Sequence, residues 1–217
     1  MYKNIAEYIH ILGNDDPNLM QYLQRIYPNF EICHNRKVLE IGSFHGNHTR
    51  IISHYKPKHI TAIEPMTDAH QYLYQFPIDN LEVHSCDIFS YLEKNHEFDV
   101  VVCCGVLYHF HSPLWLLELI ANRINPTYII MEGFFKYLEG HHAIIDKELM
   151  GVPGSRAEFS NWKHISLRLA LSYEIFLKSM EELGYQLINS QDFLPEDFDI
   201  NFHKTNITFT VWKKIEK

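Results

Sequence analysis

Short apolar runs alternate with helix-like segments along most of the chain. Runs rich in Val and Ile are typical of buried strands, whereas apolar residues spaced three and four apart indicate helices. The predicted strands are 37–42, 59–65, 81–87, 98–105, 127–135, 185–193 and 207–214. The predicted helices are 47–55, 67–76, 88–95, 112–124 and 172–184.

This alternation predicts an α/β fold. Strands that are separated by helices form a mostly parallel sheet that is covered on both faces. The last two strands have no helix between them, so we expect them to be antiparallel. The predicted fold is a Rossmann-like, open twisted sheet of about seven strands, mostly parallel with an antiparallel last strand, and with helices on both faces.

Several helix ends carry their own signals. Thr67 and Ser112 precede helices as N-caps, because a hydroxyl there can accept from a free backbone N–H. Pro113 lies in a first turn, where its missing N–H costs nothing. Gly184 ends the helix before it.

The chain length fits one domain, residues 1–217. Residues 1–35 have apolar positions at helical spacing and are expected to form an N-terminal helical cap. Segment 137–171 interrupts the alternation, since it is too long for an ordinary connection and too apolar for a linker. We expect it to be an insert that forms part of the substrate pocket.

Charge and composition narrow the class of protein. The chain carries 19 basic and 27 acidic residues, a net charge of −8, which disfavours nucleic acid as a partner. It has no apolar run long enough for a transmembrane helix, and its first residues lack the apolar core of a signal peptide. We therefore expect a cytoplasmic protein without a membrane partner, as a monomer or a homodimer. The cysteines have no metal or disulfide spacing and are expected to be reduced core residues: Cys33, Cys86, Cys103 and Cys104.

The segment KVLEIGSFHGNHTRII joins the first strand to the first helix through a turn with two glycines. A dinucleotide fingerprint has the pattern G-x-G-x-x-G, but Phe44 stands where its second glycine belongs. Phe44 blocks the close approach that a pyrophosphate needs, and Glu40 is an unsuitable neighbour for phosphate. A carboxylate there suits an ammonium group, or water bound to one.

The next two strand ends are also acidic. Glu64 lies 22 residues after Gly42, where a carboxylate can accept hydrogen bonds from ribose hydroxyls. Asp87 can accept from an adenine amino group, and Ile88 can lie on the ring face. These sites match the shape and charge of S-adenosylmethionine. The alternative is that these are ordinary strand-end acids and turn glycines.

The ordered set Glu40-x-Gly42-x-x-x-Gly46, Glu64, Asp87 and FDVVVCCGVLYH resembles the successive motifs of class I S-adenosylmethionine-dependent methyltransferases. The resemblance covers about residues 36–135, with Phe44 in place of the middle glycine. It implies methyl transfer with S-adenosyl-L-methionine as cofactor. The residues implied to bind it are Glu40, Gly42, Ser43, Phe44, Gly46, Glu64, Pro65, Met66, Asp87, Ile88, Cys104 and Gly105.

A narrower resemblance concerns CGVLYHFHSPLWLL, residues 104–117, and Val-Pro-Gly-Ser-Arg at 152–156, with a serine-capped helix at Ser172. Both are similar to segments of the tRNA wobble-uridine carboxymethyltransferase family, which uses carboxy-S-adenosylmethionine and acts on tRNA. That family has a longer region before the glycine turn and a basic C-terminal extension, neither of which this chain has. We therefore expect ordinary methyl transfer to a small-molecule acceptor.

The catalytic candidates follow the fourth strand and lie in the insert. His109 can take a proton near neutral pH, Tyr108 can hydrogen-bond the cofactor or acceptor, and Arg156 can hold an acidic acceptor. Packing of Tyr108, helix capping by His109 and an exposed Arg156 are the alternatives. Glu132 ends the fifth strand, as a cleft residue or an ordinary strand-end acid.

The 15 histidines do not form a recognisable zinc motif, since the close pairs lack a third ligand at metal-site spacing. These pairs are His45 and His48, His109 and His111, and His141 and His142. We therefore predict no metal. Three functions stay open: a small-molecule methyltransferase, a tRNA-modifying (carboxy)methyltransferase, and a non-catalytic scaffold subunit that binds the cofactor.

Overall fold

A computed structural model describes residues 29–44, 46–66, 73, 77–93, 97–110, 112–135, 143–145, 169–193 and 206–216. The helical elements are η1 (Phe30–Cys33), α3 (Asn47–His54), α5 (Ile88–Tyr91), η3 (Leu107–His109), α6 (Pro113–Leu119), η4 (Ile120–Ile124) and α7 (Tyr173–Glu182). The strands are β1 (Lys37–Ile41), β2 (His59–Ile63), β3 (Leu81–His84), β4 (Val100–Cys104), β5 (Tyr128–Phe135), β6 (Ala143–Ile145), β7 (Leu169–Leu171), β8 (Tyr185–Phe193) and β9 (Asn206–Lys214).

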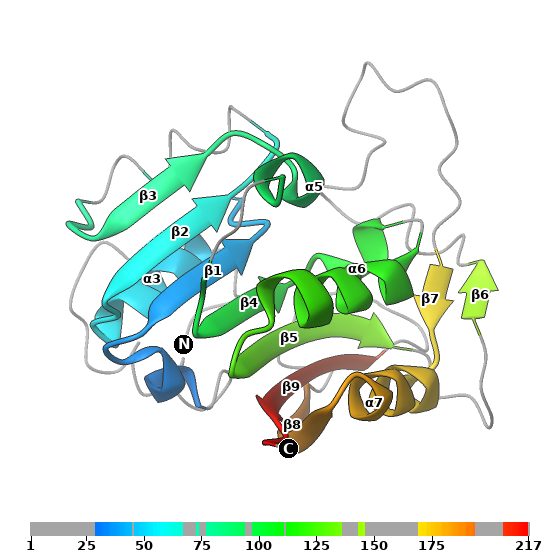
Figure 1. Cartoon of the computed structure of the whole chain (residues 1–217). Helices are drawn as coiled ribbons and strands as arrows, with labels where there is room; N and C mark the ends of the chain where they lie inside the picture. Colours follow the sequence, from blue (N-terminus) through cyan, green and yellow to red (C-terminus); the bar gives the residue numbers. More distant parts are fainter. Residues whose placement is uncertain are drawn as a thin grey trace, which may run out of the picture.

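Seven strands form one sheet in the order β3-β2-β1-β4-β5-β9-β8 (Figure 1). The first five in this order are parallel to one another. β9 pairs antiparallel with β5 and with β8. The predicted fold class is confirmed, including the antiparallel pairing of the last two strands.

Side chains alternate between the two faces of the sheet. Leu39, Val101 and Ile129 lie on the face where α6 and α7 pack, in one buried cluster. Residues one position further along each strand point to the opposite face, where α3 lies. Figure 1 shows α3 behind the sheet and α6 and α7 in front of it. The predicted helices on both faces are thus present, and the central strand β4 is buried throughout.

The ends of α6 and α7 test the predicted capping and stop residues. Ser172 caps α7, because its Oγ accepts from the Ile175 backbone N–H at 3.2 Å. Gly184 follows α7 at φ +87°, a conformation that favours glycine. Ser112 occupies the predicted N-cap position of α6, with Pro113 in the first turn, but its side chain makes no cap hydrogen bond. The predicted helix 112–124 changes after Leu119 into the π-helical turn η4.

Part of the predicted insert is visible as a second, two-stranded antiparallel sheet. β6 and β7 pair from Ala143–Leu171 to Ile145–Leu169. The rest of the insert, including Arg156, lies outside the described residues, as do the helices predicted before residue 29 and at 67–76, apart from Leu73.

The four cysteines are free thiols. Cys33, Cys103 and Cys104 are buried as predicted, whereas Cys86 is only partly buried, so placing it in the core was wrong. None of the described helices has both the length and the apolar character that crossing a membrane requires.

Candidate functional site

The turn after β1 depends on two glycines. Gly42 and Gly46 have φ of +74° and +81°, where side chains other than glycine are strained. A Cβ on Gly42 would lie 2.4 Å from Val106 Cγ2, and one on Gly46 would lie 2.1 Å from Leu73 Cδ2. The absence of a side chain at the two glycines therefore lets Val106 pack against Gly42 and Leu73 pack against Gly46. Phe44 also has a positive φ, +45°, and its side chain is 38% exposed.

Glu40 is a buried acid at the carboxyl end of β1. Its side chain is only 2% exposed, and Thr49 Oγ1 donates to Glu40 Oε2 at 2.6 Å. Among the described residues, Glu40 Oε1 has no hydrogen-bond partner. Burial raises the pKa of this carboxyl to about 7, although the Thr49 hydrogen bond acts in the opposite direction. The Oγ of Ser43 is a second buried polar atom of this turn without a partner within the described part.

Glu64 ties the ends of β1 and β2 together. Its Oε2 accepts from the Phe44 backbone N–H at 3.1 Å, and its Oε1 accepts from the Met66 N–H at 2.9 Å. The residue is buried. Both carboxylate oxygens thus accept from backbone amides at the ends of these two strands.

Asp87 caps α5 at the end of β3. Its Oδ1 accepts from the backbone N–H groups of Phe89 and Ser90, both at 2.9 Å, and its Oδ2 accepts from Ser90 Oγ at 2.9 Å. The hydrogen bonds from Ser90, and then that from Phe89, lower the pKa of Asp87, so the acid is ionised. The next residue, Ile88, is buried under this cap.

An aromatic cluster lies beside this cap. Phe89 stacks on Trp115 with ring centroids 4.5 Å apart, and meets Phe110 edge-on at 5.7 Å. Trp115 is 50% exposed. Sequence analysis missed this cluster, because its members come from three separate segments and have no common motif.

β4 ends next to β1, at the point where the chain order of the sheet reverses. Cys104 is its last residue, and Gly105 N–H donates to the Glu132 carbonyl at 3.0 Å. The short helix η3 follows and carries Tyr108 and His109. Both candidates are therefore close in the chain to the strand end, whereas Arg156 lies outside the described residues.

Glu132 and His48 approach each other above the end of β4. The distance from His48 Nε2 to Glu132 Oε2 is 3.8 Å, and the side chains are 20% and 12% exposed. Burial lowers the pKa of His48 to about 4, so the imidazole is neutral at physiological pH. Sequence analysis placed Glu132 at the cleft rim, but it considered His48 only as a member of a metal pair.

Two supporting residues escaped sequence analysis. Thr49 holds Glu40, and Val106 packs on Gly42. Thr49 could have been found from the sequence, because it places a hydroxyl in the first turn of the helix that follows the glycine turn. The contact between Val106 and Gly42 is visible only in the structure. Among the described residues, no three His, Cys, Asp or Glu side chains are grouped as metal ligands.

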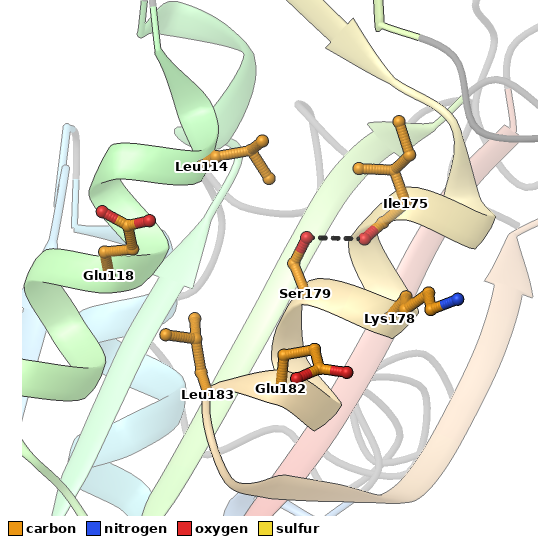
Figure 2. A pocket seen from close by; sticks show the side chains of 7 residues that line it. All are labelled: Leu114, Glu118, Ile175, Lys178, Ser179, Glu182 and Leu183. Carbon is orange, nitrogen blue, oxygen red and sulfur yellow. Dashed lines mark hydrogen bonds between the residues drawn. The ribbon is translucent and has the colours of Figure 1, made fainter.

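A groove of about 330 Å³ lies elsewhere, between α6 and α7 (Figure 2). None of the predicted cofactor residues lines it. Figure 2 shows its base formed partly by Ser179, whose Oγ donates to the Ile175 carbonyl at 2.7 Å. The lining residues are Leu114, Glu118, Ile175, Lys178, Ser179, Glu182 and Leu183.

The family follows from a comparison of the whole sequence. The profile of the methyltransferase domain matches residues 10–190, which is most of the chain. The chain belongs to the methyltransferase domain family. This membership confirms the class that the glycine turn and the acidic strand ends predict.

Curated relatives of this methyltransferase-family chain include tRNA U34 carboxymethyltransferases. The one from Shewanella sediminis is 26% identical over 209 residues, which cover 87% of this chain and 59% of the relative. The one from Desulforapulum autotrophicum is 32% identical over 98 residues, which cover 42% of this chain and 29% of the relative. The chain thus spans less than two thirds of the length of these relatives.

Solved structures share the fold at low identity. The 1,6-didemethyltoxoflavin-N1-methyltransferase of Burkholderia thailandensis, solved with bound 1,6-didemethyltoxoflavin and S-adenosylhomocysteine, superposes with a TM-score of 0.61. It is 14% identical, over 97% of this chain and 85% of that one. The [4+2]-cyclase SpnF has a TM-score of 0.64 at 12% identity, over 92% of this chain and 81% of that one. The fold is therefore shared by a methyltransferase and a cyclase.

Proposed function

We propose that this methyltransferase-family protein binds S-adenosyl-L-methionine at the carboxyl edge of its sheet and transfers the methyl group to a small-molecule acceptor. The observation that carries this proposal is Glu40. A buried carboxylate oxygen without a partner is costly. An ammonium group of a ligand would satisfy it, and the neighbouring Ser43 hydroxyl offers a second polar contact of the same turn.

The other strand ends supply the remaining contacts of the proposed site. Glu64 holds the turn through two backbone amides, and its carboxylate is the proposed acceptor for the two ribose hydroxyls. Among the described residues, the Ser90 hydroxyl donates to Asp87 Oδ2, and this oxygen is the proposed acceptor for an adenine amino group. Ile88 and the backbone of Pro65 and Met66 complete the proposed nucleoside side.

In methyl transfer, the main task of the protein is to position the cofactor and the methyl acceptor relative to each other. S-adenosylmethionine supplies a methyl group on a sulfonium, from which a neutral thioether leaves. The protein must then hold the acceptor in line with the methyl carbon. Tyr108 and His109, just after Gly105, are the proposed groups beside that carbon. We further propose that Arg156, the insert 137–171 and the cap 1–35 of a single domain enclose the acceptor.

A tRNA-modifying function is the second candidate, because the curated relatives carry that name. The net charge of −8 weighs against it, since tRNA binding requires neutralised phosphates. A scaffold that binds the cofactor without turnover is the third.

An assay with methyl-labelled S-adenosylmethionine distinguishes the three candidate functions. The protein is incubated with the labelled cofactor and either a small-molecule cell extract or bulk tRNA, and a parallel tRNA reaction contains carboxy-S-adenosylmethionine. We expect label in the small-molecule fraction and no modification of tRNA. Modified tRNA would replace our proposal by the second function. Cofactor binding without any transfer would support the scaffold.

A further inference from the structure

Glu132 lies on the face of the sheet that also carries Glu40. The residues before it and after Glu40, Met131 and Ile41, both belong to the core cluster under α6, so the two glutamates point to the opposite face. Glu132 pairs in register with Cys104, the last residue of β4. Burial raises the pKa of the Cys104 thiol, and the charges of Glu132 and Glu40 raise it further. Two carboxylates therefore flank the end of β4.

His48 lies beside Glu132, with an aromatic wall behind the imidazole. The His48 ring stacks with Phe30 at 6.5 Å, and Phe30 stacks in turn with Phe209 at 5.8 Å. Phe30 and Phe209 are fully buried, so they fix the imidazole from behind. The Glu132 side chain as a whole is 12% exposed, although its Oε2, the oxygen that faces His48, is buried.

The place of Glu132 relative to the cofactor rests on the proposed function. There the nucleoside lies over the ends of β2 and β3, on one side of the β1 turn. The acceptor must approach from the other side, where β4 and β5 end. Neighbouring strands are about 5 Å apart, so Glu132 lies about 10 Å from the β1 strand end.

We propose that Glu132, which lies beside His48, binds the amino group of the methyl acceptor, which makes the acceptor a small cationic amine. A carboxylate is a charge-assisted acceptor for an ammonium group. The second carboxylate, Glu40, adds to the same negative potential. An acceptor that carries a carboxylate would be repelled at this point.

The transfer step balances with these groups. The acceptor ammonium gives one proton to the Glu132 carboxylate, which frees the nitrogen lone pair. That lone pair forms the N–C bond with the methyl carbon while the C–S bond breaks and its electron pair stays on sulfur. The positive charge ends on the methylated amine, and the proton on Glu132 passes to solvent.

Binding of two cofactor analogues tests this inference without knowledge of the acceptor. Sinefungin carries an amine-bearing carbon in place of the methylated sulfur, so it presents an ammonium where S-adenosylhomocysteine presents none. Both are titrated calorimetrically into the wild type, Glu132→Gln and the control Glu82→Gln. Glu82 is a matched control, because its carboxylate also approaches an imidazole, His84, at 3.0 Å, but on the distant strand β3.

We expect Glu132→Gln to weaken sinefungin binding about tenfold or more, the loss of one hydrogen bond to a charged group. The affinity of Glu132→Gln for S-adenosylhomocysteine should stay within about threefold of the wild-type affinity. The control should bind both ligands like the wild type. If the wild type binds neither analogue, the proposed function fails, and this inference fails with it.

Two further outcomes overturn the inference alone. One is wild-type binding of S-adenosylhomocysteine together with an equal effect of Glu132→Gln on both analogues. The other is a loss of S-adenosylhomocysteine binding in Glu132→Gln and Glu132→Asp while both variants unfold at the wild-type temperature. Glu132→Asp also covers the case in which Glu132→Gln does not fold, since it keeps the charge but withdraws the carboxylate by one methylene, and should therefore weaken sinefungin binding selectively.

Discussion

Glu40 is held between two opposing effects. Burial favours its neutral form, whereas the hydrogen bond from Thr49 favours the charged one. The result is a carboxyl whose pKa is about 7. A positively charged ligand group would shift this balance toward the carboxylate and would donate to the buried Oε1, which has no hydrogen-bond partner among the described residues.

The first prediction concerns the pH dependence of stability. The pKa of Glu40 is about 7 in the folded protein and 4.5 ordinarily, so its stabilising effect is complete below pH 4.5 and is lost as pH rises through 7. The loss is at most about 3 kcal/mol. Urea unfolding of the wild type and Glu40→Gln at pH 5 and pH 8 should therefore show a smaller decrease in the variant.

His48 titrates in the opposite direction, because its pKa is lowered to about 4 and protonation below pH 6.5 destabilises the fold. Both proteins contain His48, so the difference between them isolates Glu40. Equal decreases in the wild type and Glu40→Gln would contradict the assignment.

At the residue scale, sequence could identify the acids and glycines but not their partners. Glu40, Gly42 and Glu64 stand out because carboxylates and glycines at strand ends are unusual for a buried core. The sequence pattern contains no distances between residues. It therefore could not show that Glu64 accepts from two backbone amides or that Val106 packs against Gly42.

At the scale of elements, the two predicted serine caps behave differently. Ser172 is fully buried and its hydroxyl accepts from the Ile175 N–H, whereas Ser112 is exposed and makes no cap bond. The sequence signal is similar at both sites. The difference comes from the backbone before each helix, which is extended at Ser172, with ψ 148°, and has ψ 84° at Ser112.

This difference gives a matched pair of variants. Ser172→Ala should lower the free energy of unfolding by about 1 kcal/mol, because the Ile175 N–H loses its acceptor in a buried position. Ser112→Ala should change it by less than about 0.5 kcal/mol. Urea unfolding monitored by circular dichroism measures both. A loss in Ser112→Ala as large as that in Ser172→Ala would refute the capping geometry.

At the scale of the whole molecule, the strands of the seven-stranded sheet were predictable, but their order and the small sheet of β6 and β7 were not. β9 enters between β5 and β8, and its residues from Thr208 to Trp212 are buried. β8 lies at the edge and exposes Leu187 and Ile188. The mainly polar pattern of β8 is consistent with an edge, yet only pairing energies across the sheet decide which strand is inside.

The strand order also explains why the acids meet. β1, β2 and β3 run parallel and side by side, so Glu40, Glu64 and Asp87 follow one another along the same edge of the sheet. The reversal of chain order between β1 and β4 is the usual position for a ligand in such sheets. The central claim is that S-adenosylmethionine binds at this edge, against the Gly42 turn.

Calorimetric titration with S-adenosylhomocysteine tests this claim most directly, on the wild type, Gly42→Ala and Gly184→Ala. Both glycines have positive φ, but only a Cβ on Gly42 meets Val106, and a Cβ on Gly184 has nothing within 4 Å. We expect micromolar wild-type binding, about tenfold or greater weakening in Gly42→Ala, and wild-type affinity in Gly184→Ala. No binding by the wild type at millimolar ligand, or equal affinities in the wild type and both variants, would contradict the proposed site.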